Sequence, residues 1–470
     1  MKLALLFLGL AWPTPLHAQE AAQEKVSFER DVVPLLRAHC HGCHQPAKAK
    51  GKLDLTRYEY LMSAEDPVVV PGKPEESLLL DLLLPFDDEP PEMPEDAEPL
   101  SAEEIDVLRR WIAEGAVDDS TAKPGPLIDA KHPPIYPCLP VVTSLAYSPD
   151  GSMLAVAGWH EVLLYPAQDK EGLPLARLVG LSPRIESLCF SPDGTHLAVG
   201  CGTPGMEGEL QVWNVPKKNL ALSIRSTFDT LRGLSWSPDG SRIAFGCSDR
   251  SLRVVEAKTG KQVLYQATHE DWVLGTAWSM EGEFLVSVSR DRSLKLVEVA
   301  TEQFIDNITS ITPGAVKGGL MSVRRHPERD ELLVGGADGV PKAYKMHREQ
   351  KRVIGDDYNL LRAFPPMHGL VYAVEWSTDG SLVAAVSGLG KKGEVCVANA
   401  ADGVEVWRHE FPFGVYALSL DSTGTRLALA GDDGMVREYA LQDGSLMREF
   451  PSAPVAAENP GPPTSQEDAQ

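Results

Sequence analysis

Between about residues 139 and 450 the chain alternates short apolar runs with polar turns at a regular interval. Each unit has an apolar segment, a turn of the Ser-Pro-Asp-Gly type, and then a second apolar run of small residues. Pro, Asp and Gly in this order favour a reversal of the chain between two strands. The pattern therefore predicts strands directly after the turns, over residues 154–157, 197–200, 243–246, 285–288 and 427–430.

The spacing of these turns defines a repeat. Turns begin at Ser148, Ser191, Ser237, Ser279, Ser377 and Asp421, which lie 43, 46, 42, 98 and 44 residues apart. The long interval covers two periods, and residues 326–330 (His-Pro-Glu-Arg-Asp) form a degenerate copy in its middle. Seven units at this period are typical of an all-β seven-bladed propeller with four strands per blade. A single large β-sandwich is the alternative, which the seven-fold period disfavours.

In its period and turns this segment resembles WD-repeat propellers, although only Trp213-Asn214 approaches their signature dipeptide. We therefore expect an incomplete network of side-chain hydrogen bonds within the blades. Four aspartates recur in the turn before the third strand of a unit, and we interpret them as structural turn caps. They are Asp249, Asp291, Asp338 and Asp433. The histidines of the segment are spread over different units, so the sequence predicts no catalytic constellation there.

Residues 25–116 have a helical periodicity instead. An apolar face made by Phe28, Val32, Val33, Leu35 and Leu36 leads directly to Cys40 and predicts a short helix. Further along, Ser101 and Glu104 form a capping box, and an apolar stripe at helical spacing then runs to Gly115. A third short helix is expected over residues 58–63. The segment therefore predicts a small all-α domain framed by a first and a last helix.

The first helix leads into Cys40-His41-Gly42-Cys43-His44, a C-x-x-C-H motif. Two thiols at this spacing can add to the two vinyl groups of one porphyrin, and the histidine that follows can bind the iron. The sequence therefore predicts one covalently bound haem c with His44 as proximal ligand. A metal-free redox pair of the thioredoxin type is the alternative, and it needs a βαβ context that is absent here. His39 and His41 are expected to face solvent.

The sixth iron ligand has to come from the segment between the two outer helices, which contains two methionines. Met62 falls in the expected short helix, only 18 residues after His44. Met93 lies in Pro90-Pro91-Glu92-Met93-Pro94, whose prolines favour a stiff, extended loop. A thioether presented on such a loop suits an axial ligand, so we predict Met93. The alternative is that Met93 only packs in a turn.

Several motifs of residues 25–116 resemble, in order, the Planctomycete-type cytochrome c domain. They are Phe28-x-x-Asp31-Val32-x-Pro34-x-Leu36, the C-x-x-C-H motif, Gly51-x-Leu53-x-Leu55, Pro71-Gly72-Lys73-Pro74-x-x-Ser77-x-Leu79, Met93-Pro94 and residues 100–116. The resemblance implies a class I cytochrome c fold in which Cys40 and Cys43 anchor the haem, His44 is the proximal ligand and Met93 the distal one. Residues 63–67 replace the glycine-rich stretch usual in the family, which affects the expected loop shape and not the ligands.

Three further segments have compositions that are typical of chain outside folded domains. Residues 1–18 combine Lys2, an apolar run and a plausible cleavage site before Gln19, as in a cleaved secretory signal. The alternative is an uncleaved membrane anchor; a cleaved signal implies an exported, periplasmic protein. We assign residues 117–138, rich in Pro, Asp and Lys, to a flexible linker, and residues 451–470 to a disordered tail.

The net charge of −23 disfavours nucleic acid and anionic membranes as partners. Residues 19–116 contain 22 Asp and Glu against 10 Lys and Arg, which suits a redox partner protein with a basic docking face. Five further cysteines are expected to be free, buried thiols, although two of them are close enough in sequence to pair. They are Cys138, Cys189, Cys201, Cys247 and Cys396, and the close two are Cys189 and Cys201.

Together these features predict an exported cytochrome that carries one haem c for single-electron transfer, with a propeller that docks its partner. His/Met ligation fills both axial positions of the iron, which favours an electron carrier over an enzyme. Two other functions stay open: a haem-bearing subunit of an oxidoreductase whose propeller binds substrate, and an interaction scaffold with a sensory haem. The first would need a second cofactor, and the sequence has neither a glycine-rich dinucleotide fingerprint nor a second C-x-x-C-H.

Overall fold

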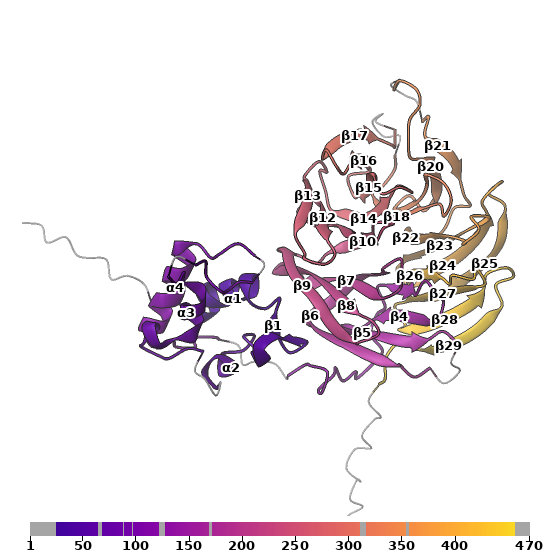
Figure 1. Ribbon diagram of the computed structural model, residues 1–470. Coiled ribbons are helices and arrows are strands. Elements are labelled where there is room, and N and C mark those ends of the chain that lie inside the picture. Colours follow the sequence, from indigo (N-terminus) through magenta and orange to yellow (C-terminus); the bar gives the residue numbers. More distant parts are fainter. Residues whose placement is uncertain are drawn as a thin grey trace, which may run out of the picture.

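The computed structural model describes residues 25–63, 68–87, 89–95, 97–121, 127–168, 172–310, 316–353 and 357–455. The predicted signal peptide (residues 1–18) and most of the predicted tail lie outside these residues. The protein is mostly β, with a small helical domain before the β region, as Figure 1 shows. In the part of the chain described, no helix is both long enough and apolar enough to cross a membrane.

The helical domain is built from short elements. They are the π-helical turn η1 (Phe28–Val32), α1 (Val33–His39), β1 (His44–Gln45), β2 (Lys48–Ala49), the 3-10 turns η2 (Lys50–Lys52) and η3 (Pro74–Glu76), α2 (Tyr58–Ser63), α3 (Leu78–Leu83) and α4 (Ala102–Ala113). The helix predicted to lead into Cys40 is therefore present as η1 and α1, with Pro34 in the first turn of α1. The helix predicted over residues 58–63 is confirmed as α2.

The last helix, α4, begins at the predicted capping box. Ser101 N–H donates to Glu104 Oε2 at 2.8 Å, and Glu104 N–H donates to Ser101 Oγ at 3.3 Å. These two bonds satisfy backbone donors that the first helical turn leaves unpaired. The buried side of α4 carries Trp111, whose ring stacks on Phe28 of η1 at a centroid distance of 5.2 Å. The first and last helices therefore pack directly on each other.

The β region consists of antiparallel sheets whose strands pair in chain order. The first sheet contains β3 (Leu145–Tyr147), β4 (Met153–Ala157), β5 (Trp159–Pro166), β6 (Ala176–Phe190), β7 (His196–Thr203), β8 (Glu207–Asn214) and β9 (Asn219–Thr227). Next come sheets of β10 (Arg232–Trp236), β11 (Arg242–Gly246), β12 (Leu252–Glu256) and β13 (Gln262–Gln266), and of β14 (Val273–Trp278), β15 (Phe284–Ser289), β16 (Leu294–Glu298) and β17 (Gln303–Asn307).

The later sheets have the same four-stranded form. They contain β18 (Leu320–Arg325), β19 (Glu331–Gly336), β20 (Lys342–Lys345) and β21 (Leu360–Ala363); β22 (Leu370–Trp376), β23 (Leu382–Leu389), β24 (Lys392–Asn399) and β25 (Glu405–Phe411); and β26 (Val415–Leu420), β27 (Arg426–Gly431), β28 (Met435–Ala440) and β29 (Leu446–Pro451). The five strands predicted after the turns are β4, β7, β11, β15 and β27.

The Ser-Pro-Asp-Gly segments form the turns that the sequence predicts. In the first, Gly151 N–H donates to the Ser148 carbonyl at 2.8 Å, and Gly151 has a φ of 70°, which glycine adopts without strain. The degenerate copy holds the equivalent place between β18 and β19. There His326 N–H donates to the Glu331 carbonyl at 2.8 Å, just as Ser148 N–H donates to Met153 at 2.9 Å. The degenerate repeat is therefore confirmed as a turn of the same kind.

Neighbouring sheets are joined by tryptophans at the ends of their first strands. The Nε1–H of Trp236 donates to the Cys189 carbonyl at 2.9 Å, and that of Trp278 donates to the Ser235 carbonyl at 3.2 Å. Each indole thereby reaches the first strand of the unit before it. The sheets also bury apolar side chains against one another. In the described residues the sheets are not joined by backbone ladders, so the closed seven-bladed ring stays a prediction.

The recurring aspartates are structural turn caps, as predicted. Asp249, Asp291, Asp338 and Asp433 each accept a backbone N–H from the residue two positions further on, at 2.9–3.1 Å. Three of them also pair with a cation four residues later, on Arg253, Lys342 and Arg437. The fourth, Asp291, accepts from His269 Nδ1 at 2.9 Å.

Two boundaries differ from the sequence prediction. Tyr136, assigned to the linker, is buried, and its hydroxyl donates to Glu161 Oε1 at 2.8 Å. Val455, assigned to the tail, forms a parallel bridge with Tyr136. The β region therefore includes residues on both sides of the predicted repeat, because Tyr136 fills a gap beside the first and last sheets.

The five cysteines of the β region and the preceding linker are free, as predicted, including the Cys189 and Cys201 pair. Cys201, Cys247 and Cys396 are buried, and Cys189 is half-buried. Cys138 is exposed, contrary to the expectation of a buried thiol.

Asp291 allows a test of these caps, because its carboxylate is buried among four donors. Burial by itself would raise the pKa of Asp291, but hydrogen bonds from His269 and Ser293 outweigh it and hold that pKa below its usual range. We predict that Asp291→Ala lowers the free energy of unfolding by about 2–4 kcal/mol, since buried donors lose their acceptor. Asp443→Ala, which removes a similar cap on an exposed turn, should cost clearly less, because water can replace the lost acceptor.

The effect of Asp291 should also depend on pH. Because its pKa is lower in the folded state, its contribution is complete above the unfolded pKa of about 4 and is lost as the pH falls below that value. Urea unfolding followed by circular dichroism should therefore show a difference between the wild type and Asp291→Ala that shrinks on acidification. An equal loss for Asp291→Ala and Asp443→Ala at pH 7 would contradict the prediction.

Candidate functional site

The C-x-x-C-H motif forms a tight turn at the end of α1. Cys40 N–H donates to Leu36 O at 2.9 Å, and His44 N–H donates to Cys40 O at 2.9 Å, so the motif continues the helix by one turn. Cys40 and Cys43 are half-buried and line the same cavity. Burial and the nearby Cys43 raise the pKa of the Cys40 thiol to about 12. A redox pair of the thioredoxin type needs a lowered thiol pKa, so this environment disfavours that alternative.

His44 is held in one tautomer by a backbone group. Its Nδ1 lies 3.1 Å from the carbonyl oxygen of Lys50, which can only accept, so Nδ1 carries the proton. Neutral imidazole then has its lone pair on Nε2, the atom through which histidine binds iron when Nδ1 is hydrogen-bonded to a carbonyl. Burial lowers the pKa of His44, which favours the neutral, ligating form.

The two neighbouring histidines have other partners. His39 Nε2 lies 3.0 Å from Glu104 Oε1 of α4, and His41 Nε2 donates to the Leu55 carbonyl at 2.9 Å. Both side chains are half-buried, so the expectation that they face solvent is wrong. The physical reason is that α4 and the loop before α2 cover this turn. Of the three imidazoles, His44 is the one that lines the cavity with its Nδ1 oriented by the backbone.

The two methionines differ in position. Met93 lines the cavity that contains Cys40, Cys43 and His44, and its backbone N–H donates to the Leu82 carbonyl at the end of α3, at 3.0 Å. Both methionines pack against the domain's apolar core, but Met62 is not among the residues that line the cavity. The structure therefore brings Met93, and not Met62, together with the motif.

The cavity itself has a volume of about 570 Å³, within the usual range for small-molecule and cofactor sites. Its apolar lining is supplied mainly by leucines, which would contact a porphyrin ring and exclude water: Leu53, Leu55, Leu78, Leu79, Leu82, Leu83 and Leu100. The sulfur and nitrogen donors are grouped with this apolar surface in one space. The residues present therefore fit a haem.

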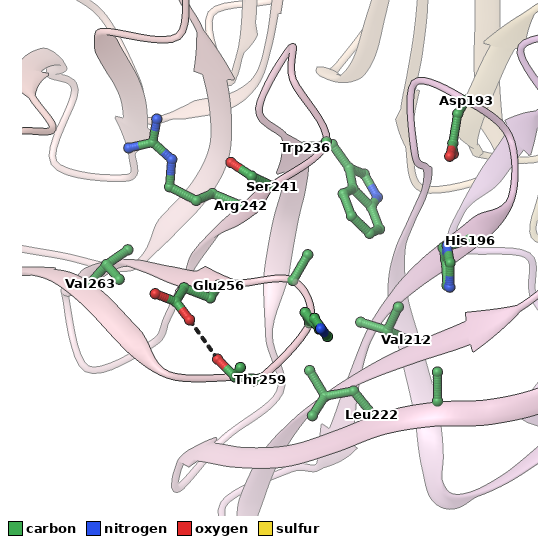
Figure 2. A pocket seen from close by; sticks show the side chains of 14 residues that line it. Asp193, His196, Val212, Leu222, Trp236, Ser241, Arg242, Glu256, Thr259 and Val263 are labelled. Atoms are coloured by element: carbon green, nitrogen blue, oxygen red, sulfur yellow. Dashed lines mark hydrogen bonds between the residues drawn. The ribbon is translucent and has the colours of Figure 1, made fainter. Parts of the chain in front are cut away.

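A second cavity, of about 770 Å³, lies between the first and second sheets of the β region. Figure 2 shows Asp193 and His196 on one side of it and Glu256 and Thr259 on the other. Its acidic groups are engaged in local turns, because Asp193 accepts from Ser191 Oγ at 2.6 Å and Glu256 accepts from Thr259 Oγ1 at 2.7 Å. These contacts account for the two carboxylates of the cavity.

A third cavity, of about 500 Å³, is lined by the first strands of successive units, from β3 to β26. It contains an ion pair in which Arg324 Nε donates to Glu375 Oε2 at 2.9 Å. Burial raises the pKa of Glu375, although the guanidinium of Arg324 opposes this effect.

Known protein families match both the helical domain and the β region. The Planctomycete cytochrome C family matches residues 40–96, which contain all four candidate haem residues. The WD domain, G-beta repeat, matches residues 138–164, 172–214 and 260–298, and the Anaphase-promoting complex subunit 4 WD40 domain matches residues 208–274. A comparison with curated proteins finds no match. The chain therefore joins a Planctomycete-type cytochrome c domain to WD repeats, and the first of these suggests a haem cofactor.

Two features of the site were missed by sequence reasoning. One is the Lys50 carbonyl that orients His44, a backbone group with no signal in the side-chain pattern. The other is that the cavity is also lined by residues 221–226 of β9, more than 120 residues after Met93. Such a contact depends on how the two regions pack, which no local motif encodes.

Proposed function

We propose that this protein is an exported, periplasmic electron carrier with one haem c, covalently bound through Cys40 and Cys43. His44 and Met93 would be its axial ligands. The observation that supports this best is the single cavity lined by all four side chains, with His44 oriented by the Lys50 carbonyl. When bound, the haem supplies one-electron chemistry between its ferric and ferrous states.

The residues around the cavity would set the properties of that haem. Leu79, Leu83 and Leu100, all buried, keep water from the porphyrin face, and a dry apolar environment disfavours the charged ferric state. His44 and Met93 together would leave no open position on the iron for a substrate. We therefore propose a carrier and not an enzyme.

We further propose that the β region is a closed seven-bladed propeller. The long strand β6 pairs with β5 through its first part and with β7 through its last part, so it would serve two blades. Tyr147 N–H of β3 donates to Ser419 Oγ of β26 at 3.0 Å, and the first and last sheets share an apolar cluster. The third cavity, lined by the first strands of the units, would be the central channel of the ring.

WD repeats suggest protein–protein interaction. The charge of the helical domain indicates the kind of partner. Its exposed carboxylates include Glu75, Glu76, Glu89, Glu92 and Glu103. Complementary charge speeds the encounter of redox partners and orients them. We propose a redox partner protein with a basic docking face, bound with the help of the propeller.

Covalent attachment can be tested directly. We predict that one haem per chain stays with the protein after acid–acetone extraction, measured as the pyridine haemochrome. Cys40→Ser or Cys43→Ser should reduce or abolish this retention, because each thiol would form one thioether bond. Cys138→Ser, which removes an exposed cysteine outside the cavity, should retain the haem. Complete extraction of haem from the wild type would contradict the proposal.

The axial ligand can be tested by a matched pair of variants. Met93→Ala should remove the weak near-infrared methionine–iron band of the oxidised protein and lower the reduction potential, since a thioether ligand stabilises ferrous haem. It should also allow carbon monoxide to bind to the reduced protein. Met62→Ala, which changes the core but not the cavity lining, should do none of these. Rapid carbon monoxide binding by the wild type would favour a sensory haem instead.

A further inference from the structure

The haem cavity is not formed by the helical domain alone. Its second side consists of residues 221–226 of β9 together with Lys258, Thr259 and Gly260 of the β12–β13 turn, which we call the β9 wall. Figure 1 shows β9 at the edge of the β region that is nearest to β1, and β9 contacts β2. The β region therefore lies against the cavity.

The contact reaches the haem-attachment motif itself. A Cβ atom added to Gly42, which lies between the two cysteines, would be only 2.5 Å from the Ser223 carbonyl oxygen of β9. Real side chains do not approach a backbone atom so closely, so the glycine is what allows the two surfaces to meet. Ala47, in the turn between β1 and β2, also packs against a buried cluster of the first sheet.

The charge of this cavity is opposite to that of the chain. Its lining includes six cationic side chains, on Arg37, Lys48, Lys50, Arg225, Arg253 and Lys258, and one carboxylate, on Glu95. In a protein with a net charge of −23 such a surface points to an anionic ligand.

Two of these cations belong to the β9 wall and have no carboxylate partner. Lys50 pairs with Glu95, and Arg253 pairs with Asp249 at 2.5 Å. Arg225 donates to the Met206 carbonyl at 3.0 Å, and among the described residues neither Arg225 nor Lys258 forms an ion pair. Both side chains are exposed, so their charges can serve a ligand in the cavity.

We propose that the β9 wall completes the haem pocket and that Arg225 and Lys258 lie close enough to the propionate carboxylates of the haem to neutralise them. This inference rests on the proposed haem site. Positive charge near the porphyrin disfavours the ferric state, which carries one more positive charge than the ferrous state. The β region thereby raises the reduction potential of the haem, in addition to excluding water from one side of it.

The test uses full-length, haem-loaded protein and measures the reduction potential by spectroelectrochemical titration. The double variant Arg225→Gln/Lys258→Gln should have a lower potential, with the ferric-to-ferrous ratio at a fixed potential raised by at least about threefold. One-electron couples change by 59 mV for each tenfold change of that ratio. Lys261→Gln is the matched control, because Lys261 is in the same turn as Lys258 but does not line the cavity, and it should leave the potential unchanged.

A second variant tests the contact between the C-x-x-C-H turn and β9 by adding a side chain where the two surfaces meet. Gly42→Leu keeps both cysteines and their spacing but cannot coexist with Ser223 in its present position. Like the double variant, it should lower the potential, and it should speed reduction by a small uncharged reductant, because the β9 wall moves away and water enters the cavity. The haemochrome assay of each variant reports separately on attachment.

The outcomes separate the two proposals. A wild-type protein without covalent haem would contradict the proposed function. A haem-loaded double variant with the same potential as the wild type and Lys261→Gln would overturn the present inference and leave the haem site intact.

Discussion

Each sheet of the β region has two largely apolar faces and can bury them only against its neighbours. This constraint makes the sheets one connected body, with Trp236 and Trp278 linking successive units. The rest of the structure depends on that body. β9 forms its edge toward the helical domain, and the C-x-x-C-H turn lies against β9 through Gly42. A packing requirement in the repeats thus defines the surface next to the candidate haem site.

The helical domain differs from the β region in how little apolar surface it can bury on its own. Its core is small, built around Phe28, Trp111 and the leucines of α3 and α4, and it lies beside the cavity. A domain of this size has limited apolar area to bury, and a bound porphyrin would add much of the missing contact. The cavity's other side is provided by the β region, so the two parts of the chain are joined by the site as well as by the segment between them.

The outer surface of the helical domain and the cavity carry charges of opposite sign. Carboxylates such as Glu75 and Glu103 are on the outer surface of the helical domain, whereas cations such as Arg225 and Lys258 face the cavity. Under the proposed function, the outer charge would attract a basic partner over a long range, and the inner charge would suit a dianionic porphyrin. The two requirements do not conflict, because the carboxylates and the cations lie on different surfaces.

The sequence by itself determined the features that depend on neighbouring residues. The Ser101–Glu104 capping box, the helix into Cys40, the Ser-Pro-Asp-Gly turns and the aspartate caps all rest on contacts within a few residues, and local pattern predicts such contacts well. Only the tertiary structure decided which residues of distant segments meet. The partners of His39 and His41, the burial of Tyr136 and the approach of Ser223 to Gly42 each join residues from separate elements. Such contacts follow from the packing of whole elements, and no short motif carries that information.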